Sequence, residues 1–299
     1  MEMKDFASKI RDSVRDGLGD GYKVDVKEVN KNNSVVRNGL VILAQGQNVA
    51  PTIYLEDFLE AYESGMPLET VVQQMLDSYR RSMPTDGLDM DFFRHFEKVR
   101  DRICFRLIGK KGNEALLEKI PYIDFLDLAI CFYYAYQDES LGEGSILIYN
   151  SHVEMWGTNA FELMSTARRN TPRLLPWTCC SLAEAMDAAG WESDAELDGF
   201  LGGLPMKVLS NTKQVHGAAC ILYPGVLEAL AQEGGCGFYI LPSSIHEVML
   251  LPDTDGHMSA DCLKLMIVDV NSTKVAPEEV LSDTLYYYDA DQKRVRQIA

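Results

Sequence analysis

The stretch Gly237–Pro252, GFYILPSSIHEVMLLP, places two apolar runs on either side of a short polar segment. Pro242 has no backbone donor and serines readily bond their own backbone, so Pro-Ser-Ser favours a turn between the runs. A short apolar run bounded by turn residues is typical of a buried strand. We therefore predict a β-hairpin with two antiparallel strands and with polar residues at its tip and just beyond.

The rest of the chain repeats this pattern of strands joined by turns. YKVDVKEV (22–29) alternates apolar and charged residues, and NKNNS separates it from VVRNGLVILA (35–44), which predicts a second hairpin. Further strands are expected at 103–109, 125–136, 144–152, 206–210, 218–223, 284–289 and 294–299. Helices are expected at 1–16, on each side of Gly65–Pro67, and at 92–99, 113–120, 160–169, 181–189, 224–232 and 259–268. Single helices inserted among such strands indicate an α+β fold with mainly antiparallel sheets.

The segment SMPTDGLDM (82–90) is the best candidate for a domain boundary, because it is rich in turn residues and poor in large apolar side chains. We predict an N-terminal module over 1–84, made of a helix, a β-hairpin and two helices. A larger α+β domain over 85–299 is expected to follow.

Charge and cysteine usage restrict the compartment and the partners. The formal net charge is −17, and residues 121–299 hold 25 acidic against 10 basic residues, which disfavours nucleic acid and anionic membranes as partners.

The most apolar run, LAICFYYAY (128–136), is too short to span a bilayer, and the N-terminus has no apolar stretch of signal-peptide length. The seven cysteines contain no C-x-x-C pair, as expected for reduced thiols. The sequence predicts a cytoplasmic protein with a protein partner.

Several complete catalytic motifs are missing from the sequence. It contains no Walker loop and no G-x-S-x-G elbow. His246-Glu247 begins like a zinc-protease motif, but Leu250 stands where the second histidine is required. We therefore predict no metal and no cofactor.

Four residues of the opening stretch remain weak catalytic candidates: Ser243, Ser244, His246 and Glu247. Neighbouring side chains on a strand point to opposite faces, so His246 and Glu247 are expected to diverge. Ser244 and His246 would share a face about 6 to 7 Å apart, too far for a hydrogen bond unless the backbone bends. Turn chemistry with a cross-strand histidine is the alternative interpretation.

Two further polar clusters supply binding candidates. STARRNTPRLLP places Arg168, Asn170 and Thr171 where a helix is expected to end at Pro172, so they either complement the helix dipole or recognise an anion. LSNTKQVHGA places Asn211 and His216 in a loop between strands, which is either a turn or a binding edge.

Long motifs in a fixed order resemble a bacterial family known as domain of unknown function 5688. They are PTIYLEDFLEAYESGMPLE, WGTNAFELMSTARRNTPRLLP, LSNTKQVHGAACILYPGVLEALA, YILPSSIHEVMLLPD and VAPEEVLSDTLYYYD, and they cover nearly the whole chain. A fainter likeness in the order of elements is to domain of unknown function 1444 and implies shared architecture only. Neither resemblance implies an activity, a cofactor or a catalytic residue.

The sequence predicts a binding or regulatory module without catalysis. The alternative is a hydrolase or transferase that uses His246 with Ser243, Ser244 or Glu247. An enzyme should gather His246, Asn211 and the Arg168–Thr171 corner around one pocket, whereas a binding module should leave them apart and expose an apolar patch.

Overall fold

A computed structural model describes residues 1–47, 50–82, 91–138, 142–189, 205–242, 244–254 and 258–298. The chain divides into two compact units. The first comprises Met1–Phe93 with Tyr136–Gly144, and the second comprises Arg94–Ala135 with Ser145–Ala299. Residues 83–90, most of the candidate boundary segment, lie outside the described residues.

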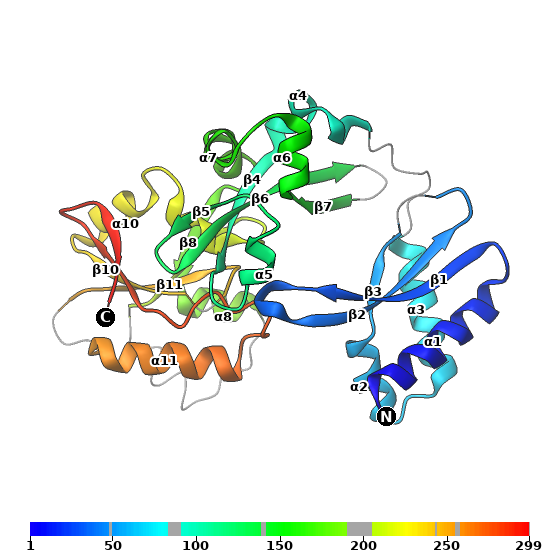
Figure 1. The fold of residues 1–299 in the computed structure, drawn as a ribbon. Helices are drawn as coiled ribbons and strands as arrows, with labels where there is room; N and C mark the ends of the chain where they lie inside the picture. Colours follow the sequence, from blue (N-terminus) through cyan, green and yellow to red (C-terminus); the bar gives the residue numbers. More distant parts are fainter. Residues whose placement is uncertain are drawn as a thin grey trace. The chain divides into compact units, whose positions relative to one another are not determined.

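The first unit is a three-stranded antiparallel sheet covered by helices (Figure 1). Its elements are α1 (Met3–Leu18), β1 (Tyr22–Asn30), a 3₁₀ turn (Asn32–Ser34), β2 (Val36–Ala44), β3 (Thr52–Tyr54), α2 (Glu56–Glu63) and α3 (Leu68–Ser82). A second 3₁₀ turn (Asp91–Arg94) contains the boundary between Phe93 and Arg94. Phe6, Ile10 and Val14 repeat every four residues along α1 and are completely buried, as the helical period requires. Gly19, with φ of 78°, ends the helix.

The second unit contains two antiparallel sheets. The four-stranded sheet has the order β4 (Ile103–Gly109), β6 (Leu128–Asp138), β5 (Tyr122–Phe125), with β7 (Gly142–Leu147) also paired to β6. The end of β6 and the start of β7 fall within Tyr136–Gly144, which is counted with the first unit. The six-stranded sheet has the order β13 (Arg294–Gln297), β12 (Tyr286–Asp289), β10 (Phe238–Leu241), β11 (Val248–Pro252), β9 (Lys207–Asn211), β8 (Trp177–Ser181). All strand pairs recorded between the described residues are antiparallel, so the fold class is α+β as predicted.

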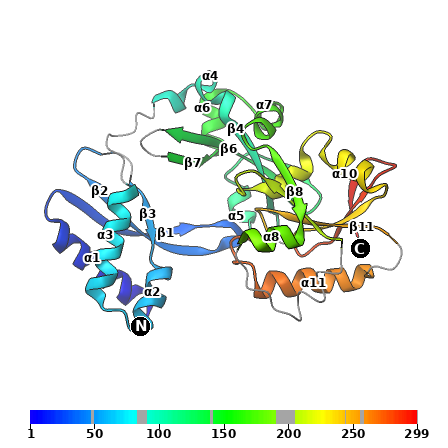
Figure 2. The same ribbon diagram turned by 180° about the vertical axis from the view of Figure 1, so that it is seen from behind.

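Helices of the second unit cover these sheets. They are α4 (Phe96–Val99), α5 (Glu114–Leu117), α6 (Asn150–Trp156), α7 (Ala160–Leu174), α8 (Leu182–Ala189), α10 (Val226–Gly234) and α11 (Ala260–Thr273), with 3₁₀ segments at Arg100–Arg102 and η4 (Gly217–Leu222). The orange helix α11 lies along the six-stranded sheet in both views (Figures 1 and 2). Its residues Leu263 and Ile267 pack against Leu241 and Leu251 of β10 and β11. No helix of the described chain is both long and apolar enough to cross a bilayer.

The hairpin predicted from Gly237–Pro252 is present. β10 pairs with β11 from Phe238↔Pro252 to Leu241↔Met249. His246 and Glu247 precede Val248, the first residue of β11, so they belong to the connection and not to the strand. The expected divergence of two strand neighbours therefore does not apply to them.

Three expected strands were wrong in part. Residues 218–223 lie mainly in the 3₁₀ segment η4, because an apolar run buried all round does not distinguish strand from helix. The strand expected over 125–136 is broken at Leu126, with φ of 58°, and Asp127 follows in the turn. The strand expected over 144–152 ends at Leu147, and α6 begins at Asn150.

The predicted helix end at Pro172 was also wrong, because α7 continues to Leu174 with Pro172 inside it. A proline costs a helix interior about 3 kcal/mol, so tertiary contacts must offset it. The next turn still closes, since Leu175 N donates to Thr171 O at 2.8 Å. Arg168 consequently lies in the body of the helix and not in its last turn.

Candidate functional site

The catalytic candidates lie in the connection between β10 and β11. Ser243 lies outside the described residues, whereas Ser244 is buried. The Ser244 hydroxyl accepts a 3.0 Å hydrogen bond from the backbone nitrogen of His246. This bond stabilises the bend that precedes β11, and it is made to the backbone of His246.

The imidazole of His246 has a partner at each nitrogen. Nδ1 accepts a 3.3 Å hydrogen bond from the backbone nitrogen of His216, and Nε2 lies 3.6 Å from Oε1 of Glu279. Because Nδ1 accepts, the network assigns the ring proton to Nε2, which faces the carboxylate. The ring is therefore oriented, and its acceptor nitrogen is already engaged by the backbone.

A second histidine, His216, packs face to face on His246. The ring centroids are 5.8 Å apart and the planes differ by 10°. Nε2 of His216 lies 3.5 Å from Nη1 of Arg106 on β4, and the ring meets Tyr133 of β6 edge-on at 5.3 Å. Both sheets of the second unit thus contribute to one cluster, which we call the histidine–arginine cluster: Arg106, His216 and His246.

The chemistry of arginine determines the tautomer of His216. A guanidinium can only donate, so Nε2 of His216 accepts and Nδ1 carries the proton. Burial, then Arg106 and then His246 hold the pKa of His216 well below its ordinary value. Within the described chain, Nδ1 of His216 and Nε of Arg106 are buried without a hydrogen-bond partner. The cluster therefore contains two buried donors that lack acceptors, which costs free energy.

Glu247 is the acidic candidate beside His246. Burial is the largest influence on its carboxyl and raises its pKa; Glu279 adds to this rise, while His246 and a hydrogen bond with Ser244 oppose it. A raised pKa favours the protonated form of a carboxyl, which is the form that can act as a general acid. Glu247 therefore remains a candidate.

Asn211 shapes the loop that leads to His216. It is fully buried, accepts a 3.0 Å hydrogen bond from Lys213 N and donates a 2.8 Å bond to Val215 O. The loop delivers His216 with φ of 55°, a left-handed conformation that costs a non-glycine residue about 1 kcal/mol. Asn211 thus acts on the cluster by closing the loop.

Gly217 permits the close approach of the two segments that carry the histidines. A Cβ at Gly217 would overlap Ser210 Oγ and His246 O. These two atoms are themselves joined by a 2.7 Å hydrogen bond. The loop can therefore reach the β10–β11 connection only with glycine at this position.

The candidates on α7 hold the helix to β4. Thr171 Oγ1 accepts a 3.1 Å hydrogen bond from Phe105 N. Asn170 Nδ2 donates to the carbonyls of Arg100 and Ile103 at 2.7 and 3.0 Å. These contacts explain how α7 continues through a proline, and they support the strand that carries Arg106.

Arg168 is exposed on α7, unlike Asn170 and Thr171, which are buried against β4 and the segment before it. The sequence candidates therefore serve different parts of the second unit. His216 and Asn211 belong with His246, whereas Asn170 and Thr171 stabilise the neighbouring helix–strand contact.

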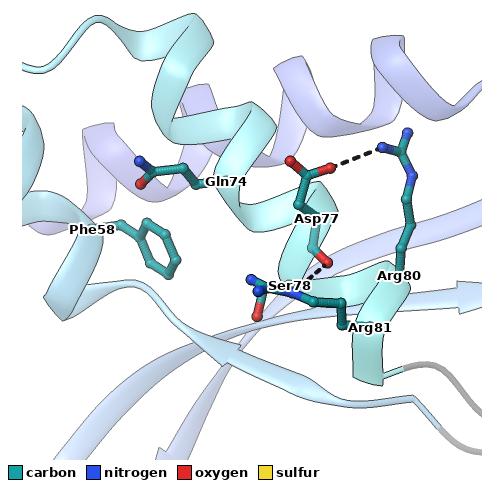
Figure 3. Close-up of a pocket in the computed structure, with 6 residues that line it drawn as sticks. All are labelled: Phe58, Gln74, Asp77, Ser78, Arg80 and Arg81. Carbon is teal, nitrogen blue, oxygen red and sulfur yellow. Dashed lines mark hydrogen bonds and ion pairs between the residues drawn. The ribbon is translucent and has the colours of Figure 1, made fainter.

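An open pocket of about 690 Å³ lies in the first unit, at α2 and α3. Figure 3 shows the six residues that line it: Phe58, Gln74, Asp77, Ser78, Arg80 and Arg81. Its charges are partly paired, because Arg80 Nη1 lies 3.1 Å from Asp77 Oδ1 and Arg81 Nε donates to the Asp77 carbonyl at 3.3 Å. The pocket offers hydrogen-bonding groups beside one aromatic ring.

The outward side of α11 carries apolar side chains. Leu265 is 72% exposed and Val268 is 49% exposed, and Cys262, one turn earlier, is exposed as well. Leu263 and Ile267 are buried on the opposite side. A helix that is apolar on both sides and covered on one exposes surface suited to a partner. We call Cys262, Leu265 and Val268 the α11 face.

Asp127 and Arg106 form important contacts in the second unit, but neither was among the candidates predicted from the sequence. Asp127 accepts hydrogen bonds from Ser282 Oγ, Thr284 Oγ1, Tyr286 OH and Gln297 Nε2, at 2.7, 2.9, 2.6 and 2.8 Å respectively. Arg106 interrupts ICFRLIG as Asp127 interrupts FLDLAICFYYAY. A charge inside an apolar run was the available signal for both, because such a charge requires a partner.

Fold and site together define an α+β protein with a histidine–arginine cluster between two antiparallel sheets and with exposed apolar side chains on the outward side of α11. Among the described residues, no group of three or more His, Cys, Asp or Glu side chains is placed to hold a metal ion. The chain belongs to a family of unknown function (DUF5688), whose model matches residues 3–290. Neither the curated proteins nor the solved structures yielded a match.

Proposed function

We propose that the protein is a bacterial, cytoplasmic binding or regulatory module without catalysis, and that it recognises a protein partner through the α11 face. The observation that carries this proposal is the exposure of Leu265 and Val268, 72% and 49%, on a helix whose other side is already packed. Apolar side chains spaced by one turn are the anchors through which a helix docks into an apolar groove of a partner.

Charge around the α11 face favours a basic partner. Asp261 lies beside the face with 90% of its side chain exposed, and Asp269 is exposed next to Val268. Lys264 partly balances Asp261, at 3.5 Å. Residues 121–299 hold 25 acidic and 10 basic residues, so a second copy of this chain would meet like charge. An apolar surface bordered by lysine or arginine is complementary to both features.

The proposal is tested by placing a photo-crosslinking residue at Leu265 in cells. The matched control carries the same residue at Phe161 on α7, which is 79% exposed. We expect one crosslinked protein from Leu265 that Phe161 does not give. The double change Leu265→Ser, Val268→Ser should abolish binding of the crosslinked partner to the purified protein, whereas Phe161→Ser should leave this binding intact. Added salt should weaken the binding of the partner to the wild-type protein.

Three results would overturn this function. Binding that survives the double Leu265→Ser, Val268→Ser change would place the interface elsewhere. A crosslink to another copy of the chain would make the face a self-association surface. Turnover of a substrate by the purified protein would contradict a module without catalysis.

The second candidate function is a hydrolase or transferase that uses His246 with Ser243, Ser244 or Glu247. The observation that favours it is the imidazole of His246, which is partly exposed and lies 3.6 Å from the Glu279 carboxylate. A positioned imidazole beside a carboxylate is the base half of many active sites. Loss of turnover in His246→Ala, with Glu279→Gln intermediate, would support this function; equal activity in His246→Ala would exclude it.

A further inference from the structure

Arg106 is half-buried, and its positive charge has no anionic partner among the described residues. Burial is the largest influence on the guanidinium and lowers its pKa, but arginine remains protonated at neutral pH. Its recorded electrostatic neighbours are Cys131, Tyr133 and Tyr149. Burial raises the pKa of Cys131 to about 12, and tyrosine is normally neutral at pH 7. Among the described residues, none of the ion pairs involves Arg106.

One edge of this guanidinium is committed and the other is available. Nη1 points to Nε2 of His216 at 3.5 Å. Nε has no hydrogen-bond partner within the described chain. The Nε–Nη2 edge presents two parallel N–H groups, the geometry that matches two oxygens of a carboxylate, phosphate or sulfate.

The side chains around this edge leave it without a recorded acidic neighbour among the described residues. His216 faces the guanidinium through Nε2, so its Nδ1–H points away from Arg106. Arg106 is only half-buried, and the neighbouring Tyr149 is 40% exposed. The carboxylate of Glu279 contacts Nε2 of His246 at 3.6 Å and is not among the recorded electrostatic neighbours of Arg106. The Nε–Nη2 edge of Arg106 therefore offers two N–H donors and a positive charge, with no carboxylate recorded beside it among the described residues.

We propose that the histidine–arginine cluster is a binding site for an oxyanion, which Arg106 holds through its Nε–Nη2 edge and which His216 and His246 adjoin. The anion neutralises the unpaired guanidinium and gives the buried Nε–H an acceptor. Both effects favour the complex, because an unpaired charge in a partly buried position and an unsatisfied buried donor each destabilise the free protein. The site uses other residues than the α11 face, so it stands or falls independently of the proposed partner.

The probe is inorganic sulfate, added to the full chain against sodium chloride of equal ionic strength. Imidazole ¹⁵N and ¹H signals of the wild-type protein report the site directly, with the exposed His95 as internal control. We expect a saturable shift of the His216 and His246 signals with an unchanged His95 signal. A parallel titration with sodium acetate identifies the chemical class of the natural ligand. Tighter binding of sulfate than of acetate indicates a phosphoryl or sulfuryl group, and tighter binding of acetate indicates a carboxylate.

Variants separate the site from general salt effects. Arg106→Gln should weaken sulfate binding at least about tenfold, because it removes the charge and the bidentate edge. Arg168→Gln, which removes an exposed arginine on α7, should bind as the wild type. The proposal is overturned if wild-type histidine signals do not saturate with either anion, if sodium chloride shifts them equally, or if folded Arg106→Gln retains the response. The wild-type titration decides the question even if Arg106→Gln does not fold.

Discussion

Replacing Asp127 by asparagine should destabilise the second unit, because this one carboxylate ties the β5–β6 turn to the C-terminal strands. Asp127 accepts hydrogen bonds at 2.7, 2.9 and 2.6 Å from Ser282, Thr284 and Tyr286. A fourth bond, of 2.8 Å, comes from Gln297 on β13. Asparagine has nearly the same shape, so Asp127→Asn removes the charge and one acceptor oxygen without opening a cavity.

The magnitude follows from the number and kind of bonds. A hydrogen bond to a charged acceptor contributes about 1.5 to 3 kcal/mol and one to a neutral acceptor about 1 kcal/mol. Asp127 is half-buried, which places its bonds at the lower end, and the hydroxyl partners can reorient toward the new amide. We expect a loss of about 3 kcal/mol, or about 6 to 12 °C in Tm for a unit of this size.

Urea unfolding followed by tryptophan fluorescence measures this loss in the second unit alone, since Trp156, Trp177 and Trp191 all belong to it. The matched control is Asp124→Asn, on the same hairpin. Asp124 forms a 2.8 Å ion pair with Lys110 but is 71% exposed. Exposed pairs contribute at most about 1 kcal/mol. Equal losses in the two variants would refute the reasoning.

The pH dependence gives a second check on Asp127. Burial raises the pKa of its carboxyl, but the bonds from Tyr286, Ser282, Thr284 and Gln297 together outweigh burial and leave the pKa below the ordinary value. The stabilisation of the folded state by the Asp127 carboxylate is therefore complete above the unfolded-state pKa of about 4. It is lost as the pH falls through the lower pKa of this carboxyl in the folded state. The difference between wild type and Asp127→Asn should shrink over that range; a constant difference would contradict the assignment.

Three further predictions concern the second unit. Below the unfolded-state pKa of about 6.5, His216 binds a proton in the unfolded chain but stays neutral in the folded protein, because its pKa there is lowered. The free energy of unfolding should therefore fall by up to about 1.4 kcal/mol per pH unit, and His216→Asn should flatten this pH dependence measured by urea unfolding. Asn211→Ala should cost about 2 kcal/mol, because the loop carbonyl and amides lose their buried partner, and the same assay would show a loss near zero if the loop closed without it. At neutral pH a maleimide should label the exposed Cys262 quickly and the buried Cys131, with its pKa raised to about 12, only on unfolding, as mass spectrometry of peptides would show.

The local elements could be predicted because their signals are local. The period of Phe6, Ile10 and Val14 specifies one buried side of α1, and the alternation in 22–29 specifies a strand. The turn chemistry of Pro242 marks the hairpin whose strands became β10 and β11. Antiparallel pairing and the α+β class follow from such short-range patterns.

The candidate site was predicted only in part. His246, His216 and Asn211 do gather in one region, although they were selected separately as polar residues beside apolar segments. The sequence candidates omitted Arg106, and its contact with His216 joins residues 110 positions apart. A contact between residues so far apart in the chain produces no periodicity or spacing in the sequence from which it could be predicted.

Tertiary packing also decided conformations that local rules opposed. Pro172 predicts a helix end, yet contacts of Asn170 and Thr171 with β4 keep α7 helical through it. The apolar run 218–223 resembles a strand, yet it forms a 3₁₀ segment that begins at Gly217, where the chain packs closely against Ser210 and His246. The physical reason is the same in each case: periodicity and turn propensity act over a few residues, whereas burial and hydrogen-bond partners are decided by segments that meet only in the folded chain.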